Sequence, residues 1–100
     1  MNYTDEIIET ALKNKFGIKK DKALKILKDY GTEPAHQEKN RVYLAAIKLS
    51  NGDLSQLENC IKTAKLDYRD ILLLAEYERV SEKALDYKPL KDPYRDLLSC

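Results

Sequence analysis

Several residue types that would indicate a specific chemistry are scarce in this chain of 100 residues. It has no tryptophan, two cysteines and one histidine. Cys60 and Cys100 lie far apart in the sequence, so they provide neither a disulfide framework nor the closely spaced ligands of a zinc site. No motif links His36 to a nucleophile or a carboxylate, and we interpret it as a surface residue. These absences argue against metal and nucleophile chemistry.

Glycine is also rare, with three isolated residues, so the chain has no glycine-rich loop that would hold a phosphate. A G-x-S-x-G nucleophile motif is absent. Pairs of carboxylates do occur, at 67 and 70 and at 92 and 96, but both lie where helix N-termini favour acidic residues. We therefore expect no enzyme activity, no catalytic residue, no metal and no cofactor.

Long apolar runs are missing as well. The longest are 42–47 and 71–75, far short of the ~20 residues that span a bilayer. The acidic first residues lack the apolar region of a secretory signal. The net charge of +1 gives no overall attraction to nucleic acids or anionic membranes. We expect a reduced, cytoplasmic protein with no membrane partner.

The residues that are abundant favour helices. The chain is 43% hydrophobic and 35% charged, with few helix breakers. Apolar residues at helical spacing predict helices at about 5–16 and 21–30, a third that ends near Ser50, a fourth that begins at Asp53 and a fifth that begins at Asp67. The predicted fold is all-α: one irregular bundle of about five helices over residues 1–100, with its core in 41–77.

The tail, 78–100, has a weaker pattern. Either Ser81 caps a short helix through Tyr87, or the fifth helix continues. Pro93 to Leu98 is expected to form a last helical turn or two. We find no alternation of apolar and polar residues that would predict a β-strand. In the fifth helix we expect the buried side to consist of Ile71, Leu72, Leu74 and Ala75.

Lysines are concentrated between residues 13 and 28, where seven lysines accompany one acid, Asp21. The favoured interpretation is two solvated helix faces. The alternative is a polyanion surface formed by Lys19, Lys20, Lys22 and Lys25. In that alternative, residues 11–30 resemble a helix-turn-helix with Gly17 in the turn and 21–30 as the recognition helix. That helix has no Arg, Asn or Gln to read bases, so its lysines would only hold phosphates.

Tyrosine is the most abundant aromatic residue, with seven copies. Tyrosines at the rim of a small core are the favoured explanation, and a tyrosine-lined partner surface is the alternative. Arg41 and Arg69 are expected to form ion pairs with Asp67, Asp70 or Glu76. Otherwise they mark a partner-facing patch, whose candidate residues are Arg41, Tyr68, Arg69, Glu76 and Tyr77.

Three blocks of this sequence also carry a family resemblance. Residues 41–53 read RVYLAAIKLSNGD, residues 67–72 read DYRDIL, and residues 75–77 read AEY. Together these blocks, about a third of the chain, resemble a family of small uncharacterised bacterial proteins with an RVxLAxLKLSxGD, DYRD and AEY pattern. The resemblance implies a bacterial, cytoplasmic, all-helical protein without an assigned activity, and it supplies no functional residues.

The predicted function is a non-catalytic protein-interaction or regulatory module that binds an unknown protein or associates with itself. Nucleic-acid binding through the lysine-rich helix pair is the alternative. The first hypothesis predicts an apolar surplus, which means more large apolar side chains than a bundle of this size buries. An exposed apolar patch would then indicate an interface. The residues of that surplus are Tyr43, Leu44, Ile47, Leu73 and Leu74.

Overall fold

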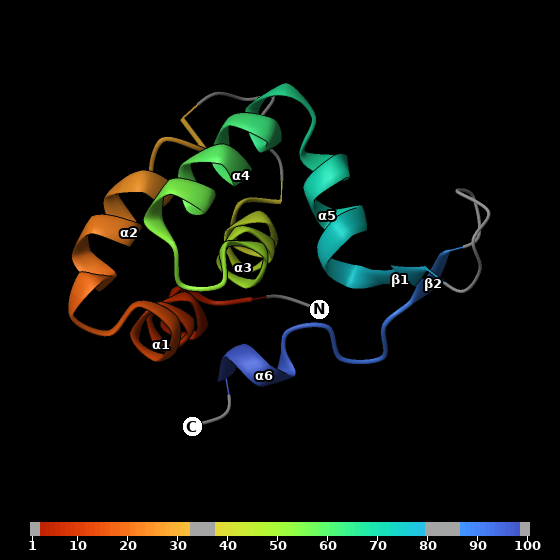
Figure 1. The fold of residues 1–100 in the computed structure, drawn as a ribbon, viewed down its shortest axis with the longest axis horizontal. Coiled ribbons are helices and arrows are strands. Elements are labelled where there is room, and N and C mark those ends of the chain that lie inside the picture. The colour runs from red at the N-terminus through yellow and green to blue at the C-terminus, as the bar shows by residue number, and fades with distance from the viewer. Residues whose placement is uncertain (1–2, 33–37, 80–86, 99–100) are drawn as a thin grey trace.

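Helices dominate the computed structural model, which describes residues 3–32, 38–79 and 87–98 (Figure 1). The elements in chain order are α1 (Asp5–Phe16), the 3₁₀ turn η1 (Gly17–Lys19), α2 (Lys20–Leu27), α3 (Lys39–Ser50), α4 (Leu54–Leu66), α5 (Tyr68–Glu76), β1 (Tyr77–Arg79), β2 (Tyr87–Pro89) and α6 (Arg95–Leu98). This arrangement confirms the predicted all-α bundle. No helix in the described segments is long and apolar enough to cross a membrane.

Polar side chains begin three of the helices where the sequence predicts. Thr4, Asp53 and Asp67 each accept a hydrogen bond from a backbone N–H in the first turn of α1, α4 and α5, respectively. These bonds satisfy donors that have no partner inside the helix. At its other end α1 stops at Gly17, whose φ of 54° favours glycine. Local sequence therefore fixes these boundaries.

The second helix is shorter than predicted. It ends at Leu27, and the next residues form a turn in which the Tyr30 N–H bonds to the Leu27 carbonyl. The Tyr30 carbonyl in turn accepts a bond from Tyr43 Oη at 2.7 Å. This contact with α3 directs the chain out of the helix, so the predicted span of 21–30 is wrong at its C-terminal end.

Helix α3 is the centre of the fold, as predicted. It is buried from Val42 through Ile47, and α4, α5 and α1 pack around it (Figure 1). Tyr43, Leu44 and Ile47 are therefore core residues and do not contribute to an exposed apolar surplus. A helix that is apolar over most of its circumference needs neighbours on several sides, and α3 has them.

The chain leaves α5 as a strand, which the sequence did not predict. Strands β1 and β2 pair antiparallel, with Tyr77 opposite Pro89. Tyr77 has an extended backbone, with φ −123° and ψ 148°, so the expectation that the fifth helix continues is wrong. Strands of three residues are too short to show an alternating pattern. The short helix proposed from Ser81 falls mainly on residues 80–86, outside the described segments.

The C-terminal segment packs on the bundle. Tyr94 and Leu97 are buried, and α6 lies against α1, where Asn14 Nδ2 donates to the Leu97 carbonyl at 2.8 Å. The predicted helical turn at Pro93 to Leu98 is present, with α6 itself starting at Arg95. The core thus extends beyond 41–77 and includes both ends of the described chain.

Candidate functional site

One of the two predicted arginine ion pairs is partly buried. Arg41 on α3 donates from Nε to Glu76 Oε2 at 2.7 Å, and from Nη2 to Glu76 Oε1. Tyr94 Oη donates to the same carboxylate at 2.5 Å. The side chain of Glu76 is only 10% exposed. We call Arg41, Glu76 and Tyr94 the Glu76 cluster; it confirms that Arg41 forms an ion pair.

Hydrogen bonds keep the Glu76 carboxylate ionised. Burial alone would raise its pKa, but the hydrogen bonds from Arg41 and Tyr94, with the charges of Arg41 and Lys48, outweigh burial and lower the pKa below its ordinary value. Burial and the hydrogen bond to Glu76 raise the pKa of the Tyr94 phenol. A charged carboxylate and a neutral phenol are therefore the stable states at neutral pH.

The Glu76 cluster joins parts of the chain that are distant in sequence. The Tyr3 ring meets the Tyr94 ring edge-on, with centroids 5.6 Å apart. Lys48 Nζ lies 5.9 Å from the centroid of Tyr94 and donates to the Ala75 carbonyl at 2.5 Å. The cluster thus links the N-terminal segment, α3, α5 and the C-terminal segment. Glu76 was expected first as an ion-pair partner of an arginine, and the structure confirms that role.

A shallow depression of about 570 Å³ lies where the start of α3 meets the outer face of α5. Leu72 and Leu73 contribute apolar area to it. Its other lining residues are Glu38, Arg41, Asp67, Tyr68, Arg69, Asp70 and Tyr77. We call this surface the α5 depression. Four of the five predicted partner-surface residues meet there, and Glu76 lies behind it, in contact with Arg41.

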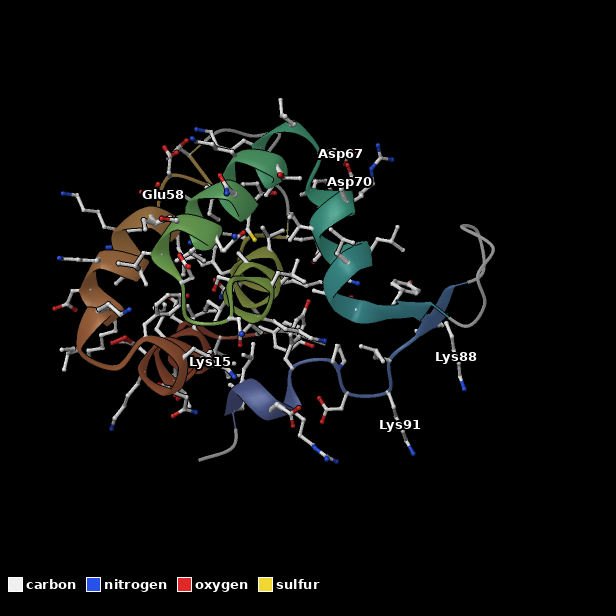
Figure 2. The ribbon with its side chains drawn as sticks, in the orientation of Figure 1. Lys15, Glu58, Asp67, Asp70, Lys88 and Lys91 are labelled. Atoms are coloured by element: carbon white, nitrogen blue, oxygen red, sulfur yellow. The ribbon has the colours of Figure 1, made fainter. Side chains whose placement is uncertain are left out.

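The second predicted arginine pair is exposed. Arg69 Nε lies 3.1 Å from Asp67 Oδ1, and the Arg69 side chain is 78% exposed. The hydrogen bond from Arg69 lowers the pKa of Asp67 and raises that of the guanidinium. Exposed pairs of this kind contribute little to stability because water screens them. Figure 2 shows Asp67 and Asp70 at the start of α5, away from Lys88 and Lys91.

Sequence reasoning missed Glu38, which lines the depression from the start of α3. Its φ of 54° lies in the left-handed region, which is uncommon for a residue other than glycine. Glu38 and Asp70 have no ion-pair partner among the residues that the structure describes. The polar stretch that precedes α3 offered no periodicity from which the position of Glu38 could be predicted.

Leu74 is 60% exposed, so its predicted place on the buried side of the fifth helix is wrong. The buried residues of α5 are Ile71, Leu72, Ala75 and Glu76. At 100° per residue, Leu74 lies roughly a third of a turn away from the centre of this stripe. Glu76 occupies the fourth buried position because Arg41 and Tyr94 bind its carboxylate. An apolar residue is thereby left on the surface close to the depression.

The lysine-rich segment also has the predicted exposure. Lys19, Lys22 and Lys25 are exposed and Lys20 is half-buried. None of the four pairs with an acid in the described segments. Helix α1, the turn at Gly17 and α2 form the predicted pair of helices. The candidate recognition helix spans Lys20–Leu27 in place of 21–30.

The cysteines, the histidine and the acidic residues provide no further candidate site in the described ranges. Cys60 is half-buried, and burial raises the pKa of its thiol, which makes it a poor nucleophile. No group of three or more His, Cys, Asp or Glu residues is placed to hold a metal ion within the described ranges. His36 and Cys100 lie outside those ranges.

Comparisons with known proteins give no relative: no protein-family model, curated protein or solved structure matches the chain. The resemblance of 41–53, 67–72 and 75–77 to a small bacterial family therefore stays a prediction. The geometry of the α5 depression is the basis for a functional hypothesis.

Proposed function

We propose that this chain is a non-catalytic, cytoplasmic bacterial module that binds a protein partner through the α5 depression. One observation carries the proposal. Arg41, Tyr68, Arg69 and Tyr77 were predicted as a partner surface from two separate parts of the sequence, and they line one depression. Tyrosine and arginine are the residue types that dominate binding energy at protein interfaces.

The chemistry of the depression supports this role. Leu73 and Tyr77 offer apolar surface, and Asp70 and Arg69 form a charged rim. The nearby Leu74 extends the apolar surface beyond what the fold buries. An apolar centre with a polar rim is the usual anatomy of an interface. The exposed Arg69 pair stabilises the fold little, so a partner accounts for it better than the fold does.

A capture experiment with matched variants tests the proposal. The tagged protein is incubated with a lysate of its source organism, and recovered proteins are identified by mass spectrometry. The double variant Arg69→Glu, Leu74→Asp changes two exposed side chains at or beside the depression. We expect it to fold normally and to lose a specific protein that wild type captures after nuclease treatment.

The control is Lys62→Glu, which makes the same reversal of charge on an exposed residue of α4 that does not line the depression. It is expected to retain the captured protein. If the depression variant retains every protein that wild type recovers, the α5 depression is not the binding surface and the proposal is wrong.

The second candidate function is nucleic-acid binding through α2. The observation that favours it is the set of lysines without acidic partners in the described segments, Lys19, Lys20, Lys22 and Lys25. Such a surface would bind phosphates with strong salt dependence and little sequence preference. Retention on duplex DNA that is abolished when all four lysines become Glu, and unchanged in the α5 variant, would favour this function over the first.

A further inference from the structure

Large apolar side chains are exposed at two places in the described part of the chain. Leu74 and Tyr77 lie on or directly after α5, and Leu66 lies at the end of α4 that precedes it. Ile18 lies in η1, the turn between α1 and α2. Figure 1 places α2 and α5 on opposite sides of α3 and α4 along the longest axis. The chain therefore has two distant apolar sites.

Ile18 is fully exposed and contributes nothing to the core. Three of the next four residues are basic: Lys19 and Lys22 are exposed, and Lys20 is half-buried, whereas Asp21 is an exposed acid that offsets one of these charges. We call Ile18, Lys19, Lys20 and Lys22 the lysine tip. An isoleucine within a cluster of cations suits a binding site that has an apolar floor and an acidic rim.

The α5 depression has those properties. The charges of Arg41 and Arg69 are already matched by Glu76 and Asp67, respectively. Glu38 and Asp70 form no ion pair in the described segments, although Arg41 and Arg69, respectively, attract them, so the rim keeps an excess of negative charge. Leu72 and Leu73 supply apolar area inside this rim. The depression is thus complementary to the lysine tip in both charge and apolarity.

We propose that the partner of the α5 depression is a second copy of this chain, which docks its lysine tip there. Ile18 contacts the apolar area, and lysines of the tip pair with Glu38 and Asp70. This inference rests on the proposed function, because it names the partner of the same surface. One molecule cannot dock its tip into its own depression, because the tip beside α2 and the depression on α5 lie on opposite sides of α3 and α4.

A contact between two different surfaces has a specific consequence. Each copy keeps one free tip and one free depression, so association continues into chains or rings and does not stop at a symmetric dimer. The interface is small and its charges are exposed. We therefore expect weak, concentration-dependent association that salt weakens.

Sedimentation velocity of the full chain at low salt, over a range of concentrations, tests the proposal. Wild type is expected to form species larger than a dimer. Ile18→Asp and Asp70→Arg are each expected to weaken association at least about tenfold, because each puts like charges or a buried charge into the contact. Ile18→Leu, which keeps the apolar contact, and Asp96→Arg, which makes the same change on an exposed residue of α6, are expected to associate like wild type.

Mixing the two weakened variants gives the sharpest result. The Ile18→Asp copy retains an intact depression, and the Asp70→Arg copy retains an intact tip. An equimolar mixture is therefore expected to form a one-to-one dimer that grows no further. Circular dichroism and melting temperature check that both variants fold. Ile18→Asp is expected to leave the melting temperature unchanged, and Asp70→Arg, which puts a cation into the first turn of α5, is expected to lower it slightly.

Two results would overturn the inference. Wild type that stays monomeric at every concentration excludes self-association, and the proposed function then survives if the Arg69→Glu, Leu74→Asp variant still loses a different protein partner. Association that Ile18→Asp leaves intact shows that the tip is not the occupant, even if the Asp70→Arg variant is monomeric.

Discussion

Arg41 and Arg69 both pair with a carboxylate near α5, yet the two pairs have different surroundings. Glu76, the partner of Arg41, is 10% exposed and also binds Tyr94. The Arg69 side chain is 78% exposed, and its partner Asp67 is also the N-cap of α5. The first pair connects four parts of the chain, whereas the second spans two residues.

The difference shows that residue type alone does not assign a role. A buried carboxylate needs its partners, because without them its charge lies unmatched in an apolar environment. An exposed pair can be removed with little change, because water replaces the partner. Arg41 is therefore primarily a structural residue, and Arg69 is available for binding. Mutations can test this division directly.

The largest expected effect comes from Glu76→Gln. This change keeps the shape of the side chain and removes the charge that Arg41 and Tyr94 bind. Because the Arg41 side chain is 37% exposed, we expect less than the full cost of breaking a buried pair, about 2 kcal/mol of unfolding free energy. Thermal denaturation should show a melting temperature lower by about 10 °C. An unchanged melting temperature would contradict a structural role for the cluster.

Tyr94→Phe is expected to have a smaller effect of the same sign. The phenylalanine ring still contacts Tyr3, but the hydrogen bond to the Glu76 carboxylate is lost. A hydrogen bond to a charged group contributes about 1.5 kcal/mol. Urea denaturation measures this loss. In the Glu76→Gln background the additional loss should be smaller, because the charged acceptor is already absent.

The pH dependence of stability sharpens the comparison. The pKa of Glu76 in the folded protein lies below its ordinary value of 4.5. A group whose pKa is lowered by folding stabilises the protein above its unfolded pKa, and this stabilisation is lost as the pH falls through the folded pKa. The difference in unfolding free energy between wild type and Glu76→Gln should therefore be constant near neutral pH and shrink below about pH 4.5. If this difference in unfolding free energy grew in acid, folding would raise the pKa of Glu76, contrary to the prediction.

Arg69→Ala has the smallest expected effect on stability. Its guanidinium is exposed, and Asp67 retains its cap bond to the backbone N–H of residue 69, so differential scanning fluorimetry should detect no change in melting temperature. Capture of the partner should nevertheless fall. A melting temperature as low as that of Glu76→Gln would show that the two arginine pairs have the same structural role.

Much of the fold was predictable because short-range signals determine it. Thr4, Asp53 and Asp67 cap helices as predicted, and Gly17 ends α1. The β1–β2 ribbon was not predictable, since each strand has three residues and the pairing depends on contacts across the intervening chain. Sequence spacing gave no reason to bury Tyr94, because its partner Glu76 lies in another element.

The candidate site was predicted in part. The ion pairs of Arg41 and Arg69 were expected with the correct set of partners, but the sequence did not reveal which pair is buried, because burial depends on where the C-terminal segment packs. Leu74 was misplaced because a polar residue, Glu76, occupies a buried position of α5. Glu38 was missed because its position follows from the packing of α3 beside α5.

Hydrogen exchange, measured by mass spectrometry on wild type alone and with its bound partner, tests the central claim most directly. The account predicts that binding protects the amides of residues 67–77 around the α5 depression, and also those of 17–22 if the partner is a second copy. If the partner binds but the amide exchange of residues 67–77 stays unchanged, the claim that the α5 depression binds the partner is contradicted.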